Sequence, residues 1–207
     1  MSMQGIVLIG AGALSRDLID CFGAQAFAGI YVDPQFAAGS IGGLPLFTSW
    51  TDVRKVASRY ILGVSDIVHR ERARAAARNA DLTPAAPMVS RLAIVASDAI
   101  LAPGVVIGHL AVIGPAASLD EDVLVMHAAI VAHDAVVQAN TVLCAGVSLG
   151  GYVRVGNNTF IGSNAVLVPG LKIGAGCHIA AGAACFHDSE PAGSWIGNPA
   201  RRALLKR

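Results

Sequence analysis

The strongest constraint in this chain is a period of six that runs without interruption from residue 93 to residue 188. Written in sixes, the segment begins AIVASD, AILAPG, VVIGHL and ends LKIGAG, CHIAAG, AACFHD. The third position is apolar in all sixteen units, and the fourth is mostly Gly or Ala. An α-helix is excluded for this segment, because a helix repeats every 3.6 residues.

A period of six with an aliphatic residue at one fixed place is typical of a hexapeptide β-helix, in which three hexads form one triangular coil. We expect the aliphatic residue to point into the prism and the small residue beside it to permit the corner. Residues 18 apart then occupy the same place in successive coils. Charged residues make up only 14% of the chain, which fits coils that stack and leave little side-chain surface for water.

The first part of the chain, residues 1–88, has a different texture and predicts a small α/β domain. Apolar runs that end in turn residues predict strands at 5–12, 28–33 and 59–66. Apolar residues at helical spacing predict helices at 14–25 and 67–80. The segment 41–50 is predicted as a turn-rich connection. This order of elements indicates a parallel sheet. We therefore expect two domains, residues 1–88 and residues 89–207.

Composition excludes several classes of protein. Hydrophobic residues reach 54%, yet no uninterrupted apolar stretch is long enough for a membrane span. The formal net charge is only +1, so nucleic-acid binding is not expected. The start has no basic segment ahead of its apolar run, which argues against a signal peptide. No CxxC pair occurs, so we expect reduced core thiols in a cytoplasmic protein and no metal site, the four cysteines being Cys21, Cys144, Cys177 and Cys185.

Two titratable residues, His133 and Asp134, stand side by side in the otherwise apolar run IVAHDAVV. They are fifth and sixth in their hexad, and Gly151 follows one coil later, which leaves open space beside the histidine. An imidazole titrates near neutrality and can accept a proton, and a carboxylate in contact with it favours its charged form. His127, stacked one coil after His109, is the rival candidate. A solvated corner histidine is the simpler alternative.

These residues carry a resemblance. The unbroken hexads, the segment AHDAVV and the ending GSWIGNPARRAL resemble the left-handed β-helix acyltransferases. More narrowly, a start such as VLIGAGALSRD ahead of the hexads resembles the sialic-acid O-acetyltransferases and the N-acetyltransferases of nucleotide-linked amino sugars. The resemblance implies a Rossmann-like N-terminal domain, a left-handed parallel β-helix, a homotrimer and acetyl-CoA as acyl donor.

The resemblance also implies roles for individual residues. It makes His133 the general base, assisted by Asp134, in a direct transfer without a covalent acyl-enzyme. It assigns acetyl-CoA contacts to three positions in the hexads, Gly151, Ser163 and Ala181. It assigns the nucleotide sugar to six positions in the N-terminal domain, Gly12, Ala13, Leu14, Asp33, Pro34 and Gly63.

The glycine turn GAGALS leaves a further possibility open. Gly10 and Gly12 supply two of the three glycines of a dinucleotide-binding motif, and Asp33 lies where that motif places its ribose-binding acid. The third glycine is replaced by Ser15. A helix that begins after such a turn would equally hold the phosphate of a nucleotide sugar. By the resemblance we therefore expect an acetyl-CoA-dependent N-acetyltransferase that acts on a nucleotide-linked amino sugar. The alternatives are an O-acetyltransferase of a sialic-acid-like sugar and a non-catalytic, nucleotide- or NAD-binding trimeric module.

Overall fold

The computed structural model describes residues 5–36 and 41–203. The chain divides into two compact units, with the boundary between Met88 and Val89. The N-terminal unit is an α/β domain and the C-terminal unit is a left-handed parallel β-helix, so the predicted fold class is confirmed. Each unit is described by itself.

The N-terminal unit is built on one parallel sheet with the strand order β3-β2-β1-β4-β5. Its elements are β1 (Gly5–Ile9), α1 (Ala13–Phe22), the 3-10 turn Ala24–Ala26, β2 (Gly29–Tyr31), the 3-10 turn Pro34–Phe36, β3 (Leu46–Phe47), α2 (Trp50–Val56), β4 (Ala57–Leu62), α3 (Ile67–Asn79) and β5 (Thr83–Pro84). The three predicted strands and two predicted helices are present. The segment predicted as a connection contains β3 and the start of α2, which are too short to show a period.

Alternation along β1 gives the sheet two buried faces. Val7 and Ile9 belong to an apolar cluster with Val53 of α2 and Ala77 of α3, and all four side chains are buried. Leu8 points to the opposite face, because successive side chains alternate in a strand, and it is also completely buried. Helices thus cover a sheet whose strand ends carry the glycine turn.

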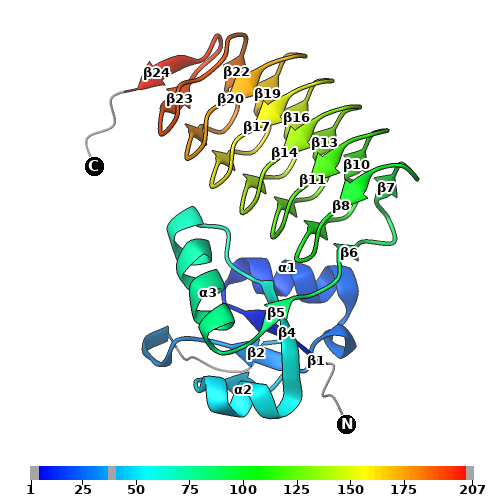
Figure 1. The fold of residues 1–207 in the computed structure, drawn as a ribbon, viewed down its shortest axis with the longest axis vertical. Helices are drawn as coiled ribbons and strands as arrows, with labels where there is room; N and C mark the ends of the chain where they lie inside the picture. The colour runs from blue at the N-terminus through cyan, green and yellow to red at the C-terminus, as the bar shows by residue number, and fades with distance from the viewer. Residues whose placement is uncertain (1–4, 37–40, 204–207) are drawn as a thin grey trace. The chain divides into compact units, whose positions relative to one another are not determined.

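The boundary falls within β6 (Met88–Val89), and the C-terminal unit continues with sixteen two-residue strands spaced six residues apart. These are β7 (Ile94–Val95), β8 (Ile100–Leu101), β9 (Val106–Ile107), β10 (Val112–Ile113), β11 (Ser118–Leu119), β12 (Leu124–Val125), β13 (Ile130–Val131), β14 (Val136–Val137), β15 (Val142–Leu143), β16 (Ser148–Leu149), β17 (Arg154–Val155), β18 (Phe160–Ile161), β19 (Val166–Leu167), β20 (Lys172–Ile173), β21 (His178–Ile179) and β22 (Ala184–Cys185). The coils stack as in Figure 1.

Three sheets form the sides of the prism. Their strand orders are β22-β19-β16-β13-β10-β7, β20-β17-β14-β11-β8 and β24-β23-β21-β18-β15-β12-β9-β6. Pairing is in the 18-residue register, as in Ile130 with Ser148 and Val131 with Leu149. The third position of each hexad is buried from Ile107 to Cys185. The predicted hexads are therefore confirmed, and β6 adds one more strand before them.

The corners show two separate requirements. The fourth position is small because the next coil stacks on it: a Cβ on Gly114 would lie 2.7 Å from the backbone nitrogen of His133. The turn itself is made two residues later, at the sixth position, where the backbone is left-handed, as at Asp134 and Asn158. The expectation that the small residue beside the aliphatic permits the corner was therefore incomplete.

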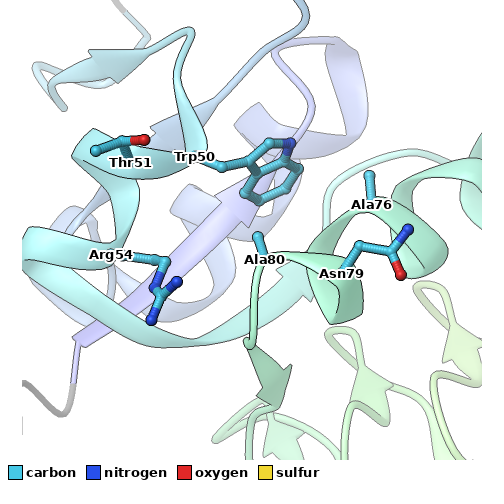
Figure 2. A pocket seen from close by; sticks show the side chains of 6 residues that line it. All are labelled: Trp50, Thr51, Arg54, Ala76, Asn79 and Ala80. Carbon is cyan, nitrogen blue, oxygen red and sulfur yellow. The ribbon is translucent and has the colours of Figure 1, made fainter.

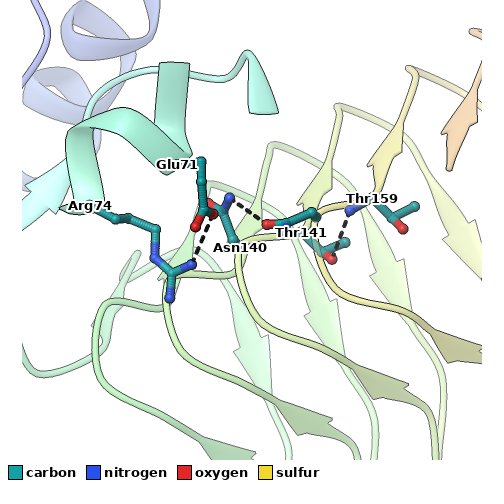
Figure 3. A network of polar contacts seen from close by, with 6 residues as sticks. Glu71, Arg74, Asn140, Thr141 and Thr159 are labelled. Atoms are coloured by element: carbon teal, nitrogen blue, oxygen red, sulfur yellow. Dashed lines mark hydrogen bonds and ion pairs between the residues drawn. The ribbon is translucent and has the colours of Figure 1, made fainter. Parts of the chain in front are cut away.

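Polar groups inside the prism are satisfied by a ladder that follows the coil repeat. The hydroxyl of Thr141 donates to the carbonyl of Gly156 at 3.1 Å, and the hydroxyl of Thr159 donates to the carbonyl of Gly174 at 3.2 Å. The backbone N–H of Thr159 also donates to the hydroxyl of Thr141 at 3.4 Å (Figure 3). Both threonines are completely buried, so these bonds remove the penalty of unpaired buried hydroxyls.

The C-terminal end closes the stack. β21 pairs with β23 (Ser194–Ile196), and His178 lies opposite Ser194, two residues short of the 18-residue repeat. β24 (Arg201–Ala203) then folds back antiparallel to β23. The last coil is thus shortened and its edge strand is covered by a strand of opposite direction.

A substitution at a fourth position tests the stacking. We expect Gly156→Ala to destabilise the protein by about 1–3 kcal/mol, the usual effect of overpacking. The added Cβ would lie 2.5 Å from the backbone nitrogen of Ala175, which cannot move without its coil. Thermal or denaturant unfolding measures the effect. Asn157→Ala, next to it on an exposed corner, is the control and should change stability by less than about 0.5 kcal/mol; equal stabilities would contradict the stacking role.

Candidate functional site

The histidine–aspartate pair lies at the corner that follows β13. Nδ1 of His133 is 2.8 Å from Oδ2 of Asp134, although the two residues are adjacent in sequence. The left-handed backbone of Asp134, with φ 57°, accompanies this contact. A carboxylate accepts, so Nδ1 donates and the neutral ring carries its lone pair on Nε2. The His133 side chain is 54% exposed, so a substrate can reach it.

The next coil leaves room for the ring. A Cβ on Gly151 would lie 2.6 Å from both Cε1 and Nε2 of His133, so only glycine permits this ring position. Tyr152 meets the imidazole edge to face, with 5.1 Å between ring centroids and an angle of 89°. Carboxylate, glycine and tyrosine together hold the imidazole in one orientation.

The rival histidine has a different environment. Nδ1 of His127 accepts the backbone N–H of His109 at 3.1 Å, so one of its nitrogens is occupied within the coil stack. Nδ1 of His109 lies 2.6 Å from the hydroxyl of Ser90. The two rings stack with 5.6 Å between centroids. This arrangement is a structural ladder on another corner.

The three positions predicted to contact acetyl-CoA fall into two groups. Gly151 lies beside His133. Ser163 and Ala181 stack on one another at the corner that also carries His109 and His127, since residues 18 apart share a corner. The sheet β22-β19-β16-β13-β10-β7 separates this corner from that of His133. Within one chain the structure therefore does not bring Ser163 and Ala181 close to His133.

A second candidate site is a cavity of about 540 Å³ in the N-terminal unit. It opens where β1 ends in the glycine turn and α1 begins, and Gly12 and Asp33 line it. A Cβ on Gly12 would meet no atom within 4 Å, so the space in front of the helix is open. Gly12 also occupies the N-cap position of α1, and no side chain there makes a capping hydrogen bond to the first N–H groups of the helix. The first N–H groups of α1 are thus available to an anion.

The other predicted nucleotide-sugar residues lie outside the lining of this cavity. Ala13 and Pro34 are exposed at its margin. The side chain of Leu14 is buried under α1. A Cβ on Gly63 would lie 2.3 Å from the hydroxyl of Ser15, so Gly63 serves the packing of the turn. Ser15 closes that turn by donating to the carbonyl of Gly10 at 2.6 Å.

Further side chains line the cavity that the sequence analysis did not assign to it, and four of them carry aromatic or basic groups. These four are Tyr31, Trp50, His69 and Arg72. Tyr31 is two residues before Asp33, and His69 and Arg72 are three apart on α3; residues so spaced share one face of a strand or helix. This spacing could have indicated from the sequence that the side chains lie on a common surface.

The aromatic pair forms one wall of the cavity. Tyr31 stacks on Trp50 with 3.7 Å between centroids. Burial, and to a smaller extent the carboxylate of Asp33, raises the pKa of the Tyr31 phenol, which therefore stays protonated. Trp50 also borders a second cavity of about 320 Å³, whose polar lining includes Arg54 and Asn79 (Figure 2).

The cysteines carry no chemistry at either site. All four are free and buried. Burial raises the pKa of the Cys144 thiol to about 11, and burial together with Cys177 does the same for Cys185. Within residues 5–36 and 41–203, no group of three or more His, Cys, Asp or Glu side chains could hold a metal ion. No helix in this part of the chain is long and apolar enough to cross a membrane.

Comparison with known proteins agrees with the repeat and with the two-part architecture. The model of the bacterial transferase hexapeptide (six repeats) matches residues 152–187. No curated protein matches the chain significantly. The acetyltransferase domain of PglB from Neisseria gonorrhoeae is 24% identical, with a TM-score of 0.86 over 96% of this chain and 98% of that one.

Two further solved structures cover the same length. PerB from Caulobacter crescentus, crystallised with CoA and GDP-perosamine, is 25% identical, with a TM-score of 0.87 over 97% of this chain and 98% of that one. WeeI from Acinetobacter baumannii is 18% identical, with a TM-score of 0.80 over 97% and 100%.

The two glycines at the mouth of the N-terminal cavity should respond differently to alanine. Gly10→Ala should lower stability by about 1–3 kcal/mol, because φ is 112° and the new Cβ would lie 2.6 Å from Val64. Gly12→Ala should leave stability within about 0.5 kcal/mol, since its Cβ meets open space. Thermal unfolding of the two variants tests this, and a Gly12 variant as unstable as the Gly10 variant would show that the space is filled.

The resemblance found in the sequence is thus confirmed at the level of repeat and fold: the chain carries hexapeptide repeats and shares, along nearly all of its length, the architecture of PerB and of the PglB acetyltransferase domain.

Proposed function

We propose that the protein is an acetyl-CoA-dependent N-acetyltransferase that acts on a nucleotide-linked amino sugar, with His133 as general base. The main observation in support is the 2.8 Å contact between Nδ1 of His133 and Oδ2 of Asp134. Because Nδ1 donates in this contact, Nε2 is left as the proton acceptor on an exposed corner. Support comes from PerB, solved with CoA and GDP-perosamine, and from the PglB domain, solved with acetyl coenzyme A.

The arrangement suits a direct transfer. Nε2 of His133 removes the proton as the acceptor amine attacks the thioester carbonyl, and the C–N bond forms. Asp134 stabilises the imidazolium that results. When the tetrahedral intermediate collapses, the C–S bond breaks and the thiolate of CoA takes the proton back from His133. No covalent bond to the enzyme is needed, and the buried, protonated thiols of Cys144 and Cys185 take no part.

The N-terminal cavity suits the nucleotide. The N–H groups of Ala13 and Leu14 begin α1 and can bind phosphate even though the Leu14 side chain is buried. Arg72 adds a cation to the lining, and the stacked Tyr31 and Trp50 offer aromatic surface for a base. Asp33 can accept from a ribose hydroxyl. A cytoplasmic location is part of this proposal, because four free, buried thiols fit a reducing compartment.

A homotrimer is also part of the proposal, and the outer faces of the prism support it. On one sheet the outward residues Val106, Leu124 and Val142 are already buried in the single chain. A second sheet presents the exposed charges of Arg154 and Lys172. The third, which we name the apolar sheet, is β22-β19-β16-β13-β10-β7, and its outward residues are uncharged, namely Ile94, Val112, Ile130, Ser148, Val166 and Ala184.

Packing three copies on the apolar sheet would cover its exposed residues, of which Ile130 is 43% and Val166 44% exposed. The apolar sheet runs between the His133 corner and the Ser163 corner. Closed threefold symmetry places opposite edges of this sheet from neighbouring copies next to each other. Ser163 and Ala181 of one copy would thus join His133 and Gly151 of another, which would account for predicted acetyl-CoA contacts that lie on two corners of one chain.

The base is tested by substitution and steady-state kinetics with acetyl-CoA and a panel of nucleotide-linked amino sugars. His133→Ala should lower kcat by roughly two to four orders of magnitude, the usual contribution of a general base. His127→Ala is the matched control and should change kcat little, because that ring serves the coil stack.

Asp134→Asn in the same assay should give an intermediate loss, since asparagine tolerates the left-handed backbone but cannot stabilise an imidazolium. An equal loss of kcat for His133→Ala and His127→Ala would contradict the assignment of His133 as the general base. Hydroxyl-bearing sugars in the panel distinguish O-acetylation, and binding of NAD in place of CoA would favour the non-catalytic module.

The trimer is tested by adding a charge to one face. Val166→Lys should yield monomers without activity, because three buried ammonium groups would meet at the apolar sheet. Ser118→Lys adds the same charge to the sheet that already carries Arg154, so it should leave a trimer. Light scattering at assay concentration gives the mass. An active Val166→Lys monomer would overturn both the trimer and the shared site.

A further inference from the structure

Tyr152 occupies a backbone conformation that suits few residues. It stands at the sixth position of its hexad with φ 62°. Left-handed backbone crowds the Cβ of bulky side chains, and glycine, asparagine and aspartate adopt it most readily. Asn140, Asn158 and Asn164 fill equivalent corners, whereas Leu110 is the other large residue so placed in the described chain. Tyrosine is therefore an unfavourable choice for the turn alone.

Contacts within the fold do not compensate for this conformation. The Tyr152 side chain is 60% exposed, so little apolar burial stabilises it. Among residues 5–36 and 41–203, its hydroxyl makes no hydrogen bond. Its ring contact is with the imidazole of His133, edge to face at 5.1 Å. A strained, exposed aromatic residue whose contact is the proposed base indicates a role in function.

The surroundings of Tyr152 are open on the side away from the base. Gly170 follows in the next coil, where its N–H bonds the carbonyl of Gly151 at 2.8 Å. A Cβ on Gly170 would meet no atom within 4 Å. An acceptor that reaches Nε2 of His133 thus enters a corner bounded by two glycines and one phenol ring.

We propose that Tyr152 is a specificity-determining residue that contacts the acceptor sugar. Its ring supplies an apolar surface for the C–H face of a pyranose, and its unbonded hydroxyl supplies a hydrogen bond to a sugar oxygen beside the reacting amine. The same ring holds the imidazole of His133 toward that amine. This inference rests on the proposed function, and it concerns the acceptor rather than acetyl-CoA.

The experiment compares Tyr152→Asn and Tyr152→Phe with the wild type, measuring kcat and both KM values and the thermal midpoint. Tyr152→Asn should lower kcat/KM for the nucleotide amino sugar about tenfold or more, while KM for acetyl-CoA changes less than about twofold. Its midpoint should rise by about 2 °C, because asparagine suits the turn. Tyr152→Phe keeps the ring and should recover part of the loss.

Leu110→Asn is the matched control, since Leu110 is 64% exposed with φ 59° on a different corner. It should raise the midpoint equally and leave the kinetics unchanged. Unchanged kinetics for Tyr152→Asn, a fall in activity that accompanies a fall in the thermal midpoint, or an equal rise in the KM values of acetyl-CoA and of the sugar would each overturn the inference. A wild type that acetylates no nucleotide amino sugar contradicts the proposed function instead; the variants are then compared on whichever sugar the wild type accepts.

Discussion

The structure depends on the backbone hydrogen bonds that join each coil to the next. The N–H of Ile130 donates to the carbonyl of Val147 at 2.7 Å, and the same step recurs along the prism. Because each residue lies beside the residue 18 positions later, the neighbours of a side chain are fixed by arithmetic. His133 lies over Gly151 for this reason, and the space for its ring exists because that one position lacks a Cβ.

Much of the C-terminal unit could be predicted from the sequence, since the period alone sets the strand positions and the buried third residues. The pair His133 and Asp134 could be located for the same reason. Their hydrogen bond, however, accompanies a left-handed backbone at Asp134, which the six-residue period alone does not predict. Tyr152 was missed because its corner was expected to need only a small residue two positions earlier.

The N-terminal unit was less predictable. A strand of two residues and a helix of seven, β3 and α2, leave too few positions for a period to appear. Trp50 lies on α2, so the aromatic wall of the cavity could not be inferred without that helix. The glycine turn was recognisable, but which of its residues line the cavity depends on packing: Gly63 is turned toward Ser15, whereas Gly12 faces open space.

The shortened last coil and the antiparallel β24 give the prism a fixed end. A stack of identical coils could otherwise be extended by any chain that offers a parallel strand. Between the two ends, gain or loss of 18 residues in evolution would keep every corner column aligned and alter only the height of the prism. Gain or loss of six would turn all later residues by one face, and an imidazole and its glycine would then lie on different corners. Evolutionary change in length is thus confined to whole coils.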